Sequence, residues 1–345
     1  MPKSASTIRD TQSLASLLGL SRWTVSRALN GHAEVNQLTR QRILAAANHE
    51  GFSPDPIARS LRGMPSNLVG VCAQDLEDFD LTPKLGRLQN NVLRHGGRAM
   101  IEITRGERVL EAGALQHFAA LRVRRVVLIG SSLTSDDALL KPLLHEGTRF
   151  VHIDPIGKRT TGAVLSDRAR AMELLILHLA ALGHRRITAL GITPTTAYGR
   201  LRAAGIRRAV KALGWNAIDA VHWIYEPDAA AGDFAYGERL VARWLREGRH
   251  SSALIALNDR VALGAIRALE NAKLRVPEDV SVVGYNNNDF ASFAKPALTT
   301  IDINTGALID GAIDRLYGAT TAHEKTLWIE PQLILRESTG RAKSL

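Results

Sequence analysis

The sequence predicts an α/β protein in which a small N-terminal helical headpiece precedes a larger core of doubly wound parallel sheets. Three observations lead to this fold class. Residues 11–50 have the apolar spacing of three short amphipathic helices. From Leu68 onward, short apolar runs alternate with amphipathic helical segments, a pattern typical of parallel strands that helices cover on both faces. The core has about ten such runs, more than one sheet usually holds, so we expect two similar lobes.

The first two helices are predicted at residues 11–18 and 22–29, with a glycine-containing turn between them. Asp10 and Ser21 are suitable N-caps, because their side-chain oxygens accept hydrogen bonds from free backbone N–H groups. The inward face of the second helix is apolar and consists of Val25, Ala28 and Leu29. The opposite face carries Arg22, Trp23, Ser26 and Arg27.

This outer face suits the major groove of DNA, where the first residues of a recognition helix contact base edges. The alternative is an amphipathic helical hairpin with solvated arginines. Asn30 and Gly31 end the second helix, since glycine readily adopts the left-handed conformation. A third helix is predicted at residues 37–50, after the N-cap Asn36. Its apolar residues would complete a three-helix core, and they are Leu38, Ile43, Leu44 and Ala47.

Residues 52–66 form a short connecting segment of different character. Asp55 followed by Pro56 is a helix start signal, and Ile57, Ala58 and Leu61 share one face of the helix that would follow. A helix this short is marginal in isolation, so it would form only against its own copy in a dimer or in a DNA groove. The alternative is a plain linker with one helical turn.

The predicted core alternates strands with helices in chain order. The predicted strands are 68–73, 99–103, 126–129, 150–153, 163–166, 186–190, 222–225, 253–256 and 280–285. The predicted helices are 83–95, 107–121, 135–145, 168–182, 198–213, 228–246 and 260–271. Ligands of such sheets bind beyond the carboxyl ends of the strands, and two lobes would place a cleft there.

Charge and composition favour an anionic partner and a soluble protein. The chain has 345 residues and a net charge of +10. Residues 1–63 contain eight Lys and Arg against four Asp and Glu, so their basic density is roughly threefold that of the rest. Cys72 is the single cysteine, which fits a reducing compartment. With no signal-peptide pattern and no bilayer-length apolar stretch, we expect a cytoplasmic protein without a membrane partner.

Several segments resemble the lactose-repressor/galactose-repressor family of bacterial transcriptional regulators. The headpiece contains the run Thr24 to Gly31, TVSRALNG, which is close to the family signature, and SPDPIARSLR resembles the family's hinge helix. Further matching segments follow in the family's order: LGHRRITAL, RLRAAGIRRAV, ALNDRVALGAIRAL, RVPEDVSVVGYNN, PALTTIDI and LILREST. Together they span nearly the whole chain.

The resemblance implies a homodimeric transcription factor, usually a repressor, that binds a near-palindromic operator in double-stranded DNA. The family's recognition positions correspond to Arg22, Trp23, Ser26 and Arg27, and its minor-groove hinge leucine corresponds to Leu61. The full set of predicted DNA-binding residues is Ser21, Arg22, Trp23, Thr24, Ser26, Arg27, Asn30 and Leu61.

The resemblance also implies a core like periplasmic sugar-binding proteins, with chain crossovers between its lobes. We therefore expect a helix-turn-helix headpiece at 1–51, a hinge at 52–66 and an effector-binding and dimerisation core at 67–345. Within the core, one lobe would contain 67–166 with 299–324. The other lobe would contain 167–298 with 325–340.

This sequence departs from the family pattern in three places. Asp55 stands where the family commonly has Asn, which brings a negative charge near the phosphates. Asn286 stands where many members have the first Asp of a GYDD or GFDD run, so the chemical type of the effector stays open among sugars, sugar phosphates, nucleosides and purines. The chain ends soon after Ser338 without the heptads of a tetramerising tail.

Six polar residues are candidates for effector binding: Arg202, Asp154, Asn286, Asp259, Arg105 and Asp289. Arg202 occupies the position of the family's effector-binding arginine, whose fork can hold vicinal hydroxyls or a carboxylate. The alternative for Arg202 is one of several arginines on a solvated face. Asp154 follows a predicted strand and could instead form a turn before Pro155. Asp259 could simply cap a helix.

We weighed three functions. A ligand-responsive DNA-binding regulator explains the headpiece and the cleft together. An α/β enzyme with a DNA-binding appendage is disfavoured, because the sequence lacks the common nucleotide-binding and hydrolase motifs and any Cys/His cluster with zinc spacing. A plain solute-binding protein is also disfavoured. Such a protein would carry an export signal, and it would have no use for a basic headpiece.

Overall fold

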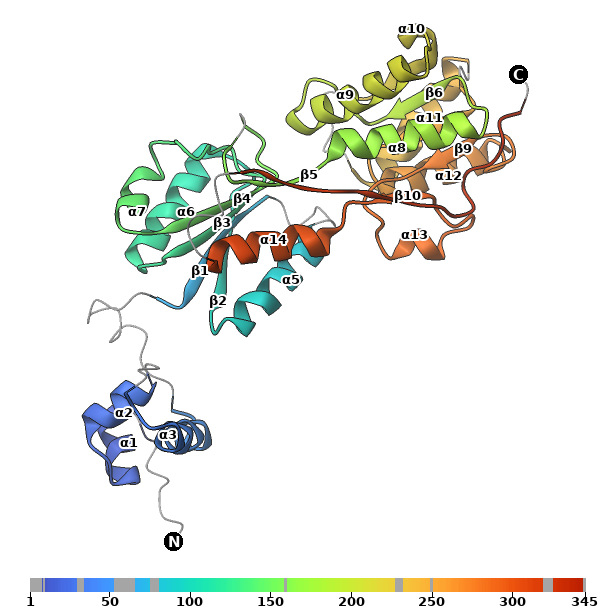
Figure 1. Cartoon of the computed structure of the whole chain (residues 1–345). Coiled ribbons are helices and arrows are strands. Elements are labelled where there is room, and N and C mark those ends of the chain that lie inside the picture. The colour runs from blue at the N-terminus through green and yellow to red at the C-terminus, as the bar shows by residue number, and fades with distance from the viewer. Residues whose placement is uncertain are drawn as a thin grey trace. The chain divides into compact units, whose positions relative to one another are not determined.

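The computed structural model describes residues 8, 10–29, 34–52, 66–74, 81–157, 160–226, 232–248, 251–318 and 325–343. The chain separates into two compact units (Figure 1). One contains Met1–Asn67 and Ala119–Arg124, and the other contains Leu68–Phe118 and Arg125–Leu345. Much of the predicted hinge, including Asp55 and Leu61, therefore lies outside the described residues.

The headpiece contains the three predicted helices: α1 (Thr11–Leu18), α2 (Arg22–Leu29) and α3 (Gln37–His49). The Asp10 carboxylate caps α1 by accepting a hydrogen bond from the Ser13 N–H at 2.7 Å. Gly19 ends α1 in the left-handed conformation, with φ at 65°. The buried core consists of Leu14, Ala15, Val25, Ala28, Val35, Ile43 and Ala47.

Two of the leucines predicted to complete this core lie at the surface instead. Leu38 is 76% exposed and Leu44 is 43% exposed, whereas Ile43 and Ala47 of the same helix are buried. Ile43 and Ala47 are four residues apart and share one narrow stripe, and Leu38 and Leu44 fall on either side of it. The headpiece is too small for its third helix to bury a wider apolar face.

The first lobe of the core is built on a six-stranded parallel sheet with the order β11-β5-β4-β3-β1-β2. Its strands are β1 (Leu68–Ala73), β2 (Arg98–Ile103), β3 (Arg125–Ile129), β4 (Arg149–Ile153), β5 (Val164–Ser166) and β11 (Leu327–Ile329). Helices α5 (Leu81–Arg94) and α14 (Thr305–Tyr317) pack on one face, and Figure 1 shows α6 (Arg108–Ala120) and α7 (Lys141–His145) toward the other.

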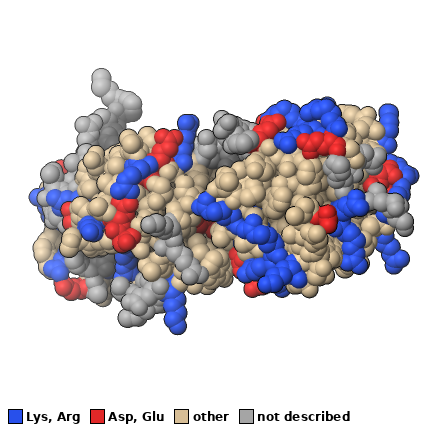
Figure 2. Space-filling view, turned by 90° about the horizontal axis from the view of Figure 1, so that it is seen from above, with Lys and Arg blue, Asp and Glu red and all other residues tan. Residues whose placement is uncertain are grey.

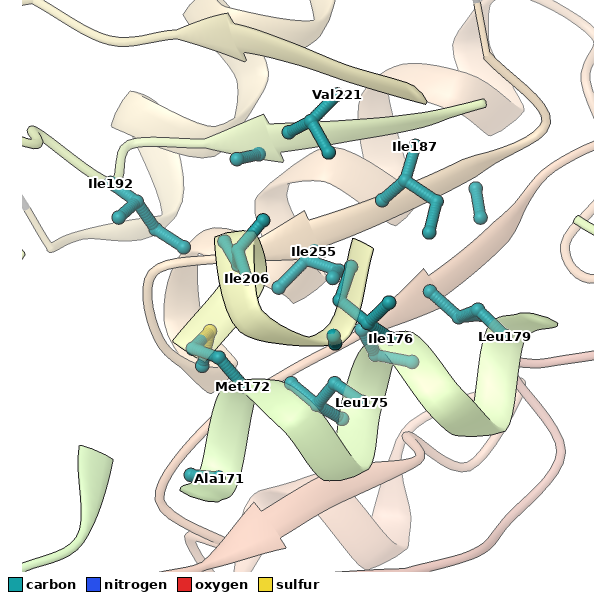
Figure 3. Close-up of a cluster of buried hydrophobic side chains, with 14 of the residues drawn as sticks. Ala171, Met172, Leu175, Ile176, Leu179, Ile187, Ile192, Ile206, Val221 and Ile255 are labelled. Atoms are coloured by element: carbon teal, nitrogen blue, oxygen red, sulfur yellow. The ribbon is translucent and has the colours of Figure 1, made fainter. Parts of the chain in front are cut away.

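The second lobe contains a four-stranded parallel sheet with the order β7-β6-β8-β9. Its strands are β6 (Ile187–Leu190), β7 (Val221–Ile224), β8 (Ala253–Ala256) and β9 (Ser281–Val283). Helices α8 (Arg168–Ala181) and α9 (Ala197–Ala212) cover one face, where Figure 3 shows Met172, Ile206 and Ile255 meeting in the buried cluster. Helices α11 (Phe234–Arg246) and α12 (Asp259–Asn271) supply the second buried cluster of this lobe.

Short elements complete this lobe and join it to the first. They are α10 (Ala217–Ala220), α13 (Phe290–Phe293), β10 (Thr300–Asp302) and β12 (Gln332–Ile334). β10 pairs antiparallel with β12, and Thr299 forms a parallel bridge with Val283 of the second-lobe sheet. The crossovers therefore come later than predicted. Residues 299–302 still lie beside the second lobe, and β11 joins the first-lobe sheet although 325–340 was assigned to the other lobe.

The reason for this difference is that β10 and β11 are strands of three residues without a distinctive pattern. Their place is decided by backbone pairing, since Leu327, Trp328 and Ile329 pair with the three residues of β5. No sequence periodicity encodes such a pairing in so short a strand.

Most other predicted helices and strands agree with the structure to within a few residues, and two helices are shorter than predicted. The predicted helix 135–145 is α7 only, because Pro142 favours the first turn of a helix over its interior. For the predicted helix 228–246, the described part begins at Phe234, after Asp233 caps it by accepting from the Tyr236 N–H at 2.7 Å. Within the described part of the chain, no helix is long and apolar enough to cross a membrane.

Candidate nucleic-acid interface and ligand cleft

The outer face of α2 presents polar and aromatic side chains, and the helix is held by an N-cap and by a buried inner face. The Ser21 hydroxyl accepts a hydrogen bond from the Thr24 N–H at 3.0 Å and lies 2.8 Å from the Thr24 hydroxyl, so it caps α2 as predicted. On the inner face Val25 and Ala28 are buried in the headpiece core. The outer face is thereby fixed, with Arg22 exposed and Trp23 60% exposed.

Trp23 and Arg27 contact each other on this face. The Arg27 guanidinium lies 4.3 Å from the centre of the Trp23 ring and forms an ion pair with Glu34. A cation over an indole ring orders both side chains. Ser26 is half-buried beside them. Asn30, the last residue predicted to bind DNA in the headpiece, lies outside the described residues.

In the core, Asp154 lies at the carboxyl end of β4 and is buried at 4% exposure. Its carboxylate accepts three hydrogen bonds and has one further close ionic contact. Oδ1 accepts from the Ser166 N–H and lies 2.8 Å from Arg168 Nη1, and Oδ2 accepts from the Ser166 hydroxyl at 2.9 Å and from Arg168 Nη2 at 3.1 Å. Arg168 is the first residue of α8. Asp154 and Arg168 therefore form a buried, bidentate ion pair.

Electrostatics keep this pair ionised. Burial raises the pKa of Asp154, but Arg168 and, less strongly, Lys84 lower it, and the net result is a pKa below the ordinary value. Burial likewise lowers the pKa of Arg168, yet Asp154, Tyr285 and Tyr198 together raise it above the ordinary value. Lys84, in the first turns of α5, is buried at 7% exposure. The Asp154 carboxylate is thus negative and the Arg168 guanidinium positive.

Tyr198 of α9 connects the second lobe to the same point of the first. Its hydroxyl donates a hydrogen bond to the Asp154 carbonyl oxygen, and the Arg168 guanidinium lies 4.0 Å from its ring centre. Burial raises the pKa of Tyr198 to about 12, so the hydroxyl stays protonated. One helical turn later, the Arg202 guanidinium lies 4.5 Å from the ring centre of Tyr285.

A cavity of about 300 Å³ opens where these elements meet. Residues of both lobes line it: Asp154, Pro155, Gly157, Thr160, Leu165, Ser166, Arg168, Ala197, Tyr198, Arg200, Leu201 and Trp328. A volume of this size fits a small metabolite. The structure therefore has a cleft between the lobes at the carboxyl ends of β4 and β5, as expected for parallel sheets.

Comparisons with known proteins agree with both parts of this description. Residues 7–55 match the family model "Bacterial regulatory proteins, lacI family", and residues 176–339 match a periplasmic binding protein-like domain. The chain is 31% identical to the HTH-type transcriptional regulator MalR of Streptomyces coelicolor, over 95% of this chain and 96% of that protein. The chain belongs to the lacI family of bacterial regulators.

Two further relatives of this lacI-family chain extend the comparison. The lactose operon repressor of Escherichia coli is 27% identical, over 88% of this chain and 82% of the repressor. The crystal structure of the lac repressor dimer bound to operator and the anti-inducer ONPF superimposes with a TM-score of 0.80 at 25% identity, covering 96% of this chain and 99% of that chain. These relatives are named regulators and repressors rather than enzymes.

Two of the other predicted effector residues follow neighbouring strands of the second lobe: Asp259 begins α12 after β8, and Asn286 follows β9. Asp259 is fully buried, and its carboxylate accepts from the Thr300 hydroxyl at 2.5 Å and from the Asn288 N–H at 2.7 Å. The alternative that Asp259 caps α12 is wrong, because Asn258 is the N-cap. The Asp259 carboxylate instead joins α12 to the segments that carry Asn288 and Thr300. Asn286 is half-buried with φ at 105°, and its N–H donates to the Ile301 carbonyl oxygen.

Asp289 and Arg105 lie at the surface. Asp289 is exposed and caps the short helix α13. Arg105 is exposed in the turn after β2, with φ at 53°. Neither lines the cavity between the lobes. Among the described residues, no group of three or more His, Cys, Asp and Glu could hold a metal ion.

Sequence reasoning missed Lys84, Arg168 and Tyr198, although signals for them were present. The strand-end rule that singled out Asp154 also applies to the ends of β1 and β5. The next helix after β1 is α5, with Lys84 as its fourth residue, and the next helix after β5 is α8, which begins at Arg168. Tyr198 precedes Arg202 by four residues on one helix, so the two share a face. What the sequence could not show is that these side chains meet around Asp154.

Proposed function

We propose that this chain is a transcriptional repressor that binds a two-fold-symmetric operator as a homodimer and responds to a small-molecule effector. The observation that carries the proposal is the outer face of α2, where Arg22 and Trp23 are exposed on a capped helix while its inner face is buried. Residues 1–51 would read the DNA, 52–66 would join them to the core, and the core from residue 67 would bind effector and form the dimer.

The side chains on α2 have the chemistry of major-groove recognition. An arginine can hold a guanine through two hydrogen bonds, and an apolar ring can contact a thymine methyl group. We assign base contacts to Arg22 and Trp23, and supporting contacts to phosphates or bases to Ser21, Thr24, Ser26 and Arg27. Asn30 and Leu61 are assigned to DNA on the family pattern alone. Because a dimer presents two such helices, the operator would contain two half-sites related by symmetry.

The cleft supplies the response to an effector. A ligand held between two lobes shifts their relative position, and through the hinges it would change the spacing of the two headpieces. Operator affinity and effector affinity are then coupled by the same factor in both directions. The effector would be a sugar, sugar phosphate, nucleoside or purine, and the protein would act in the cytoplasm, where the DNA is.

We expect Arg22→Ala and Trp23→Ala each to relax operator preference by about 1–3 kcal/mol per lost base contact. The measurement is a gel-shift or fluorescence titration with the protein's own upstream DNA and with a scrambled duplex, at one salt concentration. Gln41→Ala, an exposed change on α3, serves as the control and should leave the ratio of the two affinities unchanged. Unaltered preference in both α2 variants would refute the assignment of α2 as the reading helix.

A further inference from the structure

The second lobe has a cavity that is lined by residues of that lobe alone. Its volume is about 390 Å³, and it opens where the edge strand β7 meets α9 and α10. The lining consists of Pro194, Ile206, Arg207, Val210, Ala217, Ile218, Val221 and Trp223. None of these residues lines the cavity between the lobes. We propose that this cavity is a second ligand site, which binds a small carboxylic acid with an apolar chain. The proposal goes beyond the repressor function, because it concerns a separate site.

The floor of the cavity is part of the hydrophobic core of the lobe. Ile206, Val210 and Val221 are 1%, 2% and 7% exposed. They belong to the buried cluster in which Figure 3 shows Ile206 and Val221, and Trp223 packs against the same cluster. The floor is reached from outside because β7 is the edge strand of its sheet and the helix beside it, α10, has only four residues. An apolar ligand therefore meets core side chains there.

The rim adds apolar surface that the lobe does not bury. Ile218 of α10 is 88% exposed, more than any other large apolar side chain in the described part of the chain. An alkyl chain lying across Ile218 and the floor would remove both from water together with itself, which favours binding. A cavity with mainly apolar walls and few polar groups is typical of a small-molecule site.

Arg207 supplies the charge of the site. It is exposed on α9, and no other residue of the lining is charged. Within the described structure, the Arg207 guanidinium has no ion pair or hydrogen bond, whereas the neighbouring Arg208 pairs with Glu173. A guanidinium can hold a carboxylate through two parallel hydrogen bonds. A ligand whose chain lies in the cavity would place its carboxylate at Arg207.

The surroundings of the cavity also favour an anion. Helix α9 contains no acidic residue, and its exposed basic residues are Arg200, Arg207, Arg208 and Lys211. Figure 2 views the second lobe from the side on which Figure 1 places α9 and α10, and basic side chains gather there with fewer acidic ones among them. The acidic residue of α10, Asp219, lines an adjacent cavity together with Arg186 and His222. The local field therefore attracts a negatively charged ligand.

The test uses the full-length protein and three probes that separate charge from apolar surface: octanoate, octan-1-ol and acetate. We expect octanoate, below its micelle-forming concentration, to bind saturably in calorimetry. It should bind about fivefold more tightly than octan-1-ol, which is the upper range for an exposed ion pair. Acetate carries the charge without the chain and should show no measurable binding. Added salt should weaken the binding of octanoate more than that of octan-1-ol, because screening acts on the ionic contact.

Variants connect the binding to this cavity rather than to the one between the lobes. Arg207→Gln should weaken octanoate about fivefold and leave octan-1-ol unchanged. Ile218→Ser should weaken both probes, because it removes apolar surface from the rim. Arg208→Gln is the matched control, since it changes the next residue of the same helix outside the lining, and it should alter neither affinity. All three side chains are exposed, so each variant should fold, and its Tm without ligand checks this.

Any of four outcomes would overturn the proposal: no saturable binding of octanoate, binding of octan-1-ol as tight as that of octanoate, unchanged octanoate affinity in Arg207→Gln, or the same loss of affinity in Arg208→Gln. Operator binding is measured separately, with DNA and without these probes. A failure of the carboxylate site therefore leaves the proposed repressor function intact, and a failure of operator binding leaves the carboxylate site intact.

Discussion

We expect Asp154→Asn to lower the free energy of unfolding by about 3–5 kcal/mol, the usual cost of removing one partner of a buried ion pair. The replacement is nearly isosteric and suits the left-handed backbone at this position, where φ is 45°. It therefore removes the charge with little change of shape. The Arg168 guanidinium, whose side chain is 8% exposed, would remain buried and positive without its carboxylate.

Urea unfolding followed by fluorescence measures this loss. The control is the double variant Asp154→Asn with Arg168→Met, which removes both charges and keeps an apolar side chain of similar length. We expect it to recover most of the stability, because a buried pair can often be replaced by apolar residues at little cost. Equal destabilisation of the single and double variants would show that the ion pair is not the cause.

Stability should also fall in mild acid, through His152. This residue of β4 is 3% exposed, and neither ring nitrogen has a hydrogen-bond partner in the described structure. Burial lowers the pKa of His152 from 6.5 to about 4. The folded protein thus keeps the ring neutral while the unfolded chain takes up a proton below pH 6.5, so stability is fully present above that pH and is lost as the pH falls toward 4.

The shift corresponds to a loss of about 2 kcal/mol between pH 7 and pH 5, and about 3 kcal/mol when the pH reaches 4. His152→Leu removes the titrating group, so the difference in unfolding free energy between pH 7 and pH 5 should shrink by the same amount. His178 and His184 also have lowered pKa values because of burial. They too lower the unfolding free energy as the pH falls, and the His152→Leu variant retains their contribution. An identical pH dependence in His152→Leu and the unmodified protein would contradict the argument.

The headpiece could be predicted almost to the residue because its determinants are local. Asp10 and Ser21 cap the helices that begin next to them, and each cap satisfies an N–H three residues away. Only the width of the apolar face of α3 was overestimated, with Leu38 and Leu44 at the surface. How much of the apolar face of α3 is buried depends on the area of the helices that pack against it. The residue pattern of α3 alone does not give that area.

The cleft was predicted less completely. Asp154, singled out from its place after a strand, lines the cavity, but the partner that saturates its carboxylate was not identified. Arg202, singled out from the family pattern, is not among the residues that line the cavity. Arg168 and Asp154 are fourteen positions apart and come from different lobes. Asp259 shows the same limit, since the donors that occupy it are supplied by Asn288 and Thr300, far along the chain.

The sequence by itself determined the order of helices and strands, the two-part organisation and the membership of the lacI family, because these follow from periodicity, caps and motifs that lie within short stretches. Only the tertiary structure decided which charges meet between the lobes, where β10 and β11 pair, and which carboxylates have their acceptors in use. Those properties depend on backbone pairing and burial between distant segments, and a side chain's available charge is known only when its neighbours in space are known.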